Sequence, residues 1–194
     1  MEYIKGRPLA RLWLSMTLWQ RFIVAWTLRS YIRQLRTASA AHERRTVPGP
    51  MSDSPQAFGT PVWMFGDRFK GPYNIWTEFC DELNSIYGKR GLGLFNPTED
   101  LILTHCNLST RNIVVGEDGR LWLVDWGMSG FFPPWFEYIA TMSAAFRDAA
   151  PENWFKYIPL ITGYYPAEQK ILGWGNPRDI IERGRIYVFK TPVF

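Results

Sequence analysis

Apolar residues recur at steps of three and four over the early part of the chain, which is the period of an amphipathic helix. The repeat predicts a helix that begins near Ser15 or Thr17, with Ser15 as a suitable N-cap, and ends near Arg36. The residues before it, 1–9, read as a short extended segment and a turn. The predicted buried stripe of the helix consists of Leu18, Phe22, Ala25, Leu28 or Arg29, Ile32 and Leu35.

A second helix is predicted over roughly residues 75–87, with Phe79, Leu83 and Ile86 as its apolar stripe and Gly88 as its end. Between the two helices, prolines and glycines interrupt every period, so residues 37–73 are predicted to form a long loop. We expect this loop to pack on the domain through its large apolar residues, which are Phe58, Trp63, Met64, Phe65 and Phe69. Later helices are predicted over about 135–149, about 151–161 and from about 177.

The middle of the chain carries the pattern of short strands. Residues 101–105 are a short apolar run, and the runs 113–115 and 121–124 flank Gly116-Glu117-Asp118-Gly119, which predicts a β-hairpin. A loop followed by a tight hairpin brings the two ends of the segment together. Polar residues sit at both ends, and they are His105, Cys106, Asn107, Asn112 and Asp125.

Composition limits the possible classes of protein. The 194 residues suit one globular domain, with 46% hydrophobic and 16% aromatic residues. A net charge of +4 permits an anionic ligand such as a nucleotide but does not demand nucleic acid. We expect no nucleic-acid partner. The sequence has neither a secretory signal nor an uncharged apolar run long enough to cross a bilayer, and its two cysteines cannot form a disulfide framework. We therefore expect an intracellular, cytoplasmic protein without a membrane partner.

Residues 101–130 resemble the catalytic and metal loops of the aminoglycoside phosphotransferase and choline kinase-like family, which has a protein-kinase-like fold. The family pattern is His-Gly-Asp-Leu-x-x-x-Asn, a hairpin, and then Ile-Asp-Trp. This chain reads His105-Cys106-Asn107-Leu108-Ser109-Thr110-Arg111-Asn112, a hairpin, and then Val124-Asp125-Trp126. The stretches 130–133 and 135–138 are similar to the fungal branch of the family, and residues 1–9 are similar to its hinge between lobes.

The resemblance implies an α+β, mainly helical fold, the carboxy-terminal lobe of the kinase-like domain, with the hairpin between the catalytic and metal loops. A single domain would cover residues 1–194, with a hinge at 1–9, a helical lobe at 10–194 and the amino-terminal lobe absent. Asn112 and Asp125 would bind Mg²⁺, His105 would support the catalytic loop, and Glu137 would be a buried acid anchoring the loop after the metal site. Backbone groups around Glu2, Tyr3 and Ile4 would face the adenine of ATP, and the acceptor would be a hydroxyl of a small molecule.

Two residues depart from the family pattern. Asn107 stands where the family has its catalytic aspartate, and Cys106 replaces the usual glycine. The aspartate orients the acceptor hydroxyl and takes its proton, whereas a neutral amide can only accept a hydrogen bond. Loss of a positioned general base typically lowers the rate by about 10²–10⁴-fold. Because phosphoryl transfer depends mainly on positioning and electrostatics, residual activity is conceivable.

Simpler interpretations stand beside these roles. Asn112 and Asp125 could be turn residues, and Asn107 could be a former catalytic position that keeps one loop hydrogen bond. A thiol nucleophile at Cys106, a zinc site and a phosphate loop in Gly88-Lys89-Arg90-Gly91-Leu92-Gly93 are disfavoured because each lacks the required partners or spacing. The basic stretch is interpreted as a solvated helix face rather than a phosphate or RNA contact, and it comprises Arg29, Arg33, Arg36, Arg44 and Arg45.

Three hypotheses about function follow. The chain is a degenerate or truncated family member without useful activity, an active phosphotransferase that has lost its amino-terminal part, or a binding module that keeps the fold for partner contact. We favour the first hypothesis because of Asn107. No residue of this sequence indicates an aminoglycoside site.

Overall fold

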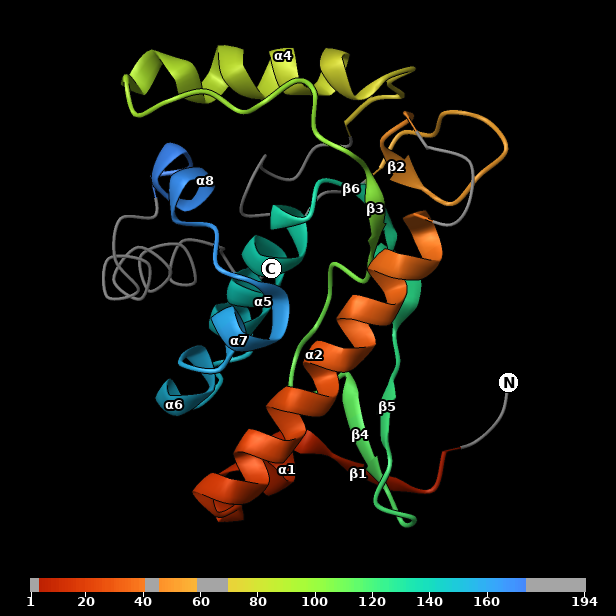
Figure 1. The fold of residues 1–194 in the computed structure, drawn as a ribbon, viewed down its shortest axis with the longest axis vertical. Helices are drawn as coiled ribbons and strands as arrows, with labels where there is room; N and C mark the ends of the chain where they lie inside the picture. The colour runs from red at the N-terminus through yellow and green to blue at the C-terminus, as the bar shows by residue number, and fades with distance from the viewer. Residues whose placement is uncertain (1–3, 41–45, 59–69, 174–194) are drawn as a thin grey trace, which may run out of the picture.

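The computed structural model describes residues 4–40, 46–58 and 70–173 (Figure 1). About half of these residues are helical, and two small antiparallel sheets of three strands each complete the fold. The predicted α+β class is therefore confirmed at this level. The α-helices are α1 Leu9–Leu12, α2 Leu18–Ala40, α4 Trp76–Tyr87, α5 Trp135–Arg147, α6 Glu152–Phe155, α7 Ile158–Thr162 and α8 Pro166–Ile171. The strands are β1 Gly6–Pro8, β2 Gly49–Pro50, β3 Ile102–Thr104, β4 Ile113–Gly116, β5 Leu121–Leu123 and β6 Gly130–Phe132.

The predicted hairpin and the short strand before it are both present. Strands β4 and β5 pair as a hairpin with Ile113 opposite Leu123, and β1 adds to the other edge of β4. Strand β3 pairs with β6 in the second sheet, whose order is β2-β6-β3. Gly130 permits the close approach of β2, because a Cβ at this position would lie 2.4 Å from the carbonyl oxygen of Gly49.

Helix α2 begins next to Thr17, the later of the two predicted starts, and runs beyond the predicted end near Arg36 to Ala40. Its start is a capping box in which Gln20 N–H donates to Thr17 Oγ1 over 3.2 Å and Thr17 N–H donates to Gln20 Oε1 over 2.8 Å, so Ser15 is not the cap. The first residues of the predicted stripe were assigned to the wrong face, since Leu18 is 74% exposed and Phe22 is also exposed. The helix packs one side against the rest of the described chain, and its main contacts are with α7, β3 and β5. The residues buried on that side are Val24, Ala25, Leu28 and Ile32.

Helix α4 confirms two members of its predicted stripe and corrects the third. Phe79 and Leu83 are fully buried, whereas Ile86 is exposed and Tyr87 is buried in its place. Phe58, from the predicted loop, is buried against Phe79 with ring centroids 5.4 Å apart. The packing predicted for that loop is thus confirmed for Phe58, while Trp63, Met64, Phe65 and Phe69 lie outside the described residues.

The helices after the second sheet form the rest of the core. Helix α5 is buried along most of its length, and Trp13 packs edge-on against Trp154 of α6 with ring centroids 4.9 Å apart. The single helix predicted over 151–161 is two short helices, α6 and α7. Pro159 explains the break, because a proline is tolerated in the first turn of a helix and not in its interior. The helix predicted from about 177 lies outside the described residues.

Among the described residues, no helix combines the length and the apolar character that crossing a bilayer would require. The prediction that the chain lacks a membrane-spanning helix is confirmed for that part of the chain.

Candidate functional site

The loop that follows β3 is anchored by a buried carboxylate. Glu137 on α5 accepts hydrogen bonds from His105 N–H over 2.6 Å and from Cys106 N–H over 3.2 Å. Its burial raises the pKa of Glu137 to about 7, although these two bonds and the charge of Arg36 act in the opposite direction. Glu137 is a buried acid as predicted, but it fixes the 105–106 loop and not the loop after the predicted metal site.

The His105 ring joins this loop to the end of β5. Asn107 N–H donates to His105 Nδ1 over 3.2 Å, so Nδ1 is the unprotonated nitrogen and Nε2–H donates to the carbonyl of Val124 over 3.1 Å. Burial lowers the pKa of His105, which favours this neutral form. The ring also lies edge-on to Trp126, with centroids 4.6 Å apart.

Three of the predicted site residues meet beside this histidine. Asn107 Nδ2 donates to Asp125 Oδ2 over 2.6 Å, and Asn112 Nδ2 donates to the same oxygen over 3.2 Å. Asn112 Nδ2 also lies 3.0 Å from the carbonyl oxygen of Asn107. Asn107 is only 7% exposed, whereas Asp125 is exposed. The hairpin therefore brings the two ends of the segment together, as the sequence predicts.

Arg147 is a member of this site that the sequence did not indicate. Its Nη2 donates to Asn107 Oδ1 over 2.9 Å, from the last residue of α5. We call Asn107, Asn112, Asp125 and Arg147 the polar cluster. Within it, both ends of the Asn107 amide are engaged, the nitrogen by a carboxylate and the oxygen by a guanidinium group.

Asp148 holds Arg147 of the polar cluster in place through a hydrogen bond. The sequence did not indicate this role. Its side chain is almost fully buried and accepts hydrogen bonds from Ser109 Oγ, Arg111 Nε and Arg147 Nε. Burial by itself would raise the pKa of Asp148, but these hydrogen bonds hold the pKa below its ordinary value. Asp148 thus ties Arg147 to the loop between Asn107 and Asn112. The only sequence signal was an acid directly after an arginine at a helix end.

The oxygens at the exposed side of the polar cluster suit a hard cation. No described residue donates a hydrogen bond to Asp125 Oδ1 or Asn112 Oδ1. Mg²⁺ is commonly held by one or two protein oxygens together with the phosphates of its nucleotide. The residues therefore fit Mg²⁺ bound with a phosphate ligand. Among the described residues, no group of three or more His, Cys, Asp and Glu side chains is placed to hold a metal ion.

Two backbone distortions accompany the cluster. Asp125 lies in the left-handed region with φ 66° and ψ 64°, and Cys106 has φ 55°. Residues other than glycine adopt such values at a cost of about 1–3 kcal/mol, and they do so mainly where surrounding contacts fix them, often at functional sites. The Cys106 backbone is fixed by Glu137, and its thiol pKa is raised well above the usual value by burial, which disfavours a thiolate nucleophile.

The structure describes some of the remaining predicted positions and not others. Ile4 is half-buried and precedes β1, whereas Glu2 and Tyr3 lie outside the described residues. Gly88–Arg90 form a 3-10 helix at the end of α4, so only Gly91-Leu92-Gly93 of this segment is irregular. Cys80 and Cys106 are buried and free.

Two arginines of the predicted basic stretch hold α2 against α7 through hydrogen bonds to backbone carbonyls. Arg29 Nη1 donates to the carbonyl of Leu160 over 2.6 Å, and Arg36 Nη2 donates to that of Thr162 over 2.6 Å. Arg33 is exposed. Arg44 and Arg45 lie outside the described residues.

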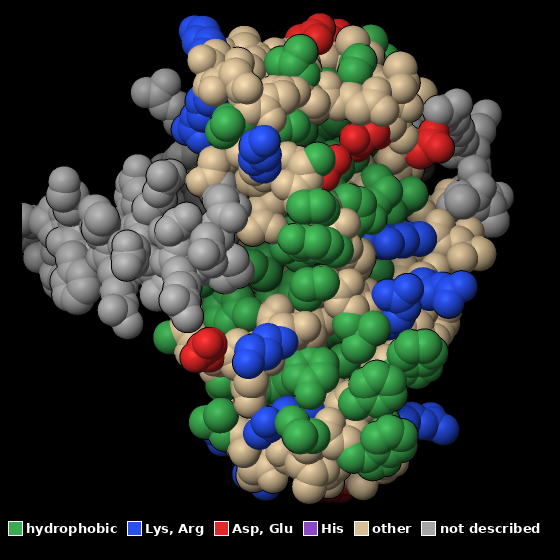
Figure 2. Space-filling model, turned by 60° about the vertical axis from the view of Figure 1, so that its left-hand side comes forward, with side chains coloured by type: hydrophobic (Ala, Val, Ile, Leu, Met, Phe, Trp, Pro, Cys, Tyr) green, Lys and Arg blue, Asp and Glu red, His purple; other side chains and the backbone are tan. Residues whose placement is uncertain are grey.

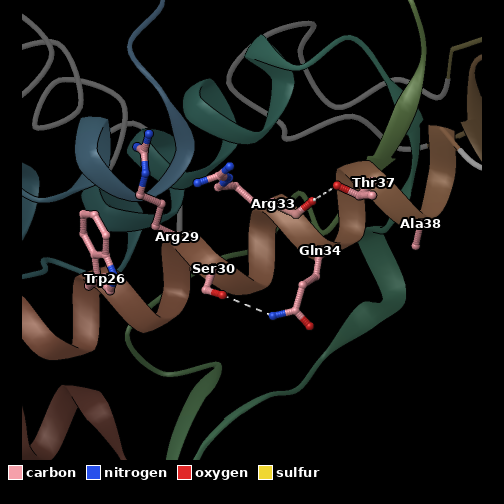
Figure 3. Close-up of a pocket in the computed structure, with 7 residues that line it drawn as sticks. All are labelled: Trp26, Arg29, Ser30, Arg33, Gln34, Thr37 and Ala38. Carbon is pink, nitrogen blue, oxygen red and sulfur yellow. Dashed lines mark hydrogen bonds between the residues drawn. The ribbon is translucent and has the colours of Figure 1, made fainter.

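Two hollows border α2, and neither has a predicted site residue in its described lining. One, of about 550 Å³, lies along Trp26, Arg29, Ser30, Arg33, Gln34, Thr37 and Ala38 (Figure 3). The other, of about 350 Å³, is lined by Tyr31, Gln34, Leu35, Ala38, Leu121, Trp122, Leu123 and Trp126. We place the candidate site at the polar cluster despite this, because it is there that chemically complementary side chains converge.

No protein-family model matches this chain, and neither does any curated protein with which it was compared.

Proposed function

We propose that this chain is a kinase-like phosphotransferase lobe that binds a nucleotide with Mg²⁺ at the polar cluster but transfers phosphate poorly. The single observation that carries the proposal is the meeting of Asn107, Asn112 and Asp125 at hydrogen-bond distance. Phosphoryl-transfer sites place an acceptor-orienting residue, a carboxamide and a metal-binding carboxylate in this relation. In this proposal Asn112 and Asp125 hold the cation, which neutralises phosphate charge when it is bound.

Impaired transfer follows from the chemistry of Asn107. Its amide carries no lone pair that can take a proton at neutral pH, and Arg147 already donates to its oxygen. An acceptor hydroxyl would therefore find no base on this side chain, and Arg147 already takes one of the two acceptor positions of its oxygen. The degenerate form of the proposed enzyme is favoured over the fully active one for this reason.

Calorimetric titration of the purified chain with ATP, with and without Mg²⁺, tests the proposal. We expect binding that requires Mg²⁺ and that is lost in Asp125→Ala. Asp118→Ala is the matched control, because Asp118 is an exposed carboxylate in the turn at the opposite end of the same hairpin. Equal binding by wild type and Asp125→Ala, or no binding by either, would refute the proposed nucleotide site.

Turnover separates the degenerate form from the active one. We expect ATP consumption by the wild type to stay at the background set by Asp125→Ala, and Asn107→Asp to raise it by about 10²-fold or more if the acceptor is present. Mg²⁺-dependent turnover by the wild type that vanishes in Asp125→Ala would instead identify an active phosphotransferase.

A further inference from the structure

The exposed side of α2 begins with a group of large apolar side chains. Trp19 is 68% exposed and Trp26 is 56% exposed, and the Phe22 ring stacks between them with centroid distances of 5.7 and 5.9 Å. We call the whole group the aromatic face, and it consists of Leu14, Leu18, Trp19, Phe22, Ile23 and Trp26. Leu14 precedes α2, and the helical period places the other five residues opposite the buried residues of α2, so α2 carries apolar residues on two sides.

The charge around the aromatic face has one sign along this segment. Residues 4–40 contain no Asp or Glu, and their cations are Lys5, Arg7, Arg11, Arg21, Arg29, Arg33 and Arg36. Arg29 and Arg33 follow Trp26 along the same side of α2 and line its hollow (Figure 3). Figure 2 shows hydrophobic side chains together with Lys and Arg side chains over the lower half of the molecule, the level at which α1 and the start of α2 lie in Figure 1.

These observations point to one occupant, and we propose that the aromatic face binds the surface of an anionic lipid bilayer. A helix that lies in a bilayer interface presents Trp, Phe and Leu to the acyl boundary and Lys or Arg to the headgroups. Tryptophan rings are enriched at that depth because they are apolar with one polar edge. This contact needs no spanning helix, so the proposal departs from the expectation of no membrane partner and leaves the finding on spanning segments unchanged.

The charge also argues against a second copy of the chain on this face. An isologous contact would bring two sets of these cations together with no acid from residues 4–40 between them, which is unfavourable. Phosphate-bearing headgroups supply the missing negative charge, and each cation near such a surface strengthens binding about fivefold. One acid lies near this segment. Trp13, in the 3-10 helix η1 (Trp13–Ser15), donates from Nε1 to Asn153 Oδ1, and Glu152 precedes Asn153 at the start of α6.

Vesicle partitioning of the full chain tests the proposal. Phosphatidylcholine vesicles are compared with vesicles containing about one-third phosphatidylserine at low and at physiological salt. We expect at least about tenfold stronger binding to the anionic vesicles, weakened by salt. The double variant Trp19→Ser/Trp26→Ser and the double variant Arg11→Glu/Arg33→Glu are each expected to weaken it about tenfold or more.

Matched controls distinguish this contact from general stickiness. Trp122→Ser removes an exposed tryptophan on the hairpin, and Lys89→Glu reverses an exposed cation at the end of α4. Both should bind like the wild type, and all variants should keep the wild-type melting temperature because the changed side chains are exposed. Equal binding to neutral and anionic vesicles, absence of binding, or retained binding by both double variants would overturn the proposal. A monomer–dimer equilibrium abolished by Trp19→Ser/Trp26→Ser would overturn it in favour of a second copy.

Discussion

Asn107 Nδ2 donates a hydrogen bond to Asp125 Oδ2 over 2.6 Å, so the residue at the catalytic position of the resembled family is bonded to the proposed metal ligand. An aspartate at position 107 could not make this bond while ionised, because it has no donor. The amide therefore holds the two loops together without a cation between them.

Replacement of Asn107 by Asp is expected to destabilise the chain in the absence of divalent cations. Two carboxylates would face each other, and a hydrogen bond to a charged group would be lost, at a cost of about 1.5–3 kcal/mol partly offset by Arg147. Chemical denaturation measures the loss, and MgCl₂ should restore more stability to Asn107→Asp than to the wild type. Asn107→Ala is the control, since it removes the same bonds without adding charge and should gain no more stability from MgCl₂ than the wild type does. An Asn107→Asp protein as stable as wild type without Mg²⁺ would contradict the account.

Glu137 is expected to be the strongest anchor of the loop before Asn107. Glu137→Ala leaves two buried N–H groups, of His105 and Cys106, without their acceptor, which should cost about 2–4 kcal/mol at pH 7. Hydrogen exchange should speed up at these two amides in particular. Glu137→Gln keeps one acceptor oxygen and should lose less. Unchanged exchange at both amides in Glu137→Ala would show that the carboxylate does not hold the loop.

Glu99 should make stability depend on pH between about 4.5 and 7. Burial raises the pKa of Glu99 to about 7, while the hydrogen bond from Trp135 Nε1 acts in the opposite direction. The folded state thus binds a proton that the unfolded state releases, so this stabilisation is complete below the unfolded pKa and is lost as pH rises through about 7. Glu99→Gln can still accept from Trp135 and should raise stability at pH 8 by roughly 1–3 kcal/mol relative to wild type. Urea denaturation at pH 5 and pH 8 checks this, and an equal effect at both would refute it.

Asp148 should have the opposite dependence. Its pKa is depressed by its hydrogen bonds, so its contribution is present above the ordinary aspartate pKa and is lost as pH falls through the lower folded value. Asp148→Asn should destabilise the chain by roughly 1–3 kcal/mol at pH 7, because the charged acceptor of Arg111 and Arg147 is lost. The difference from wild type should shrink in acid. The matched control Asp118→Asn changes a surface carboxylate and should have a small effect at either pH, and a loss equal to that of Asp148→Asn would contradict the assignment.

The sequence predicted local structure best where one physical cause decides it. The β4–β5 hairpin follows from a four-residue turn between apolar runs, and the meeting of Asn112 with Asp125 follows from the hairpin. Burial was harder to predict on α2. Its apolar residues occupy two sides, and periodicity alone cannot say which side the rest of the chain covers, so Leu18 and Phe22 were assigned to the core.

Long-range polar contacts were the part that the sequence could not supply. Arg147 and Asp148 lie 40 residues or so from the loop that they hold, and nothing local to α5 indicates that its end points at Asn107. Their role depends on where the packing of α5 against α6 and α7 places its end, which is a property of the assembled core. Glu137 was predicted to be buried, but its partners depended on the same packing.

Each of the two sheets has only three short strands, and sheets of this size depend on a hydrophobic face or on packing against a helix for their stability. Asn107 comes shortly after β3 of one sheet, and Asp125 comes shortly after β5 of the other. The hydrogen bond between Asn107 and Asp125 therefore links the two sheets, and so does the bond between His105 and Val124. Such cross-links couple local opening of one sheet to opening of the other. The two sheets should therefore behave as one cooperative unit, whose amides exchange together rather than strand by strand.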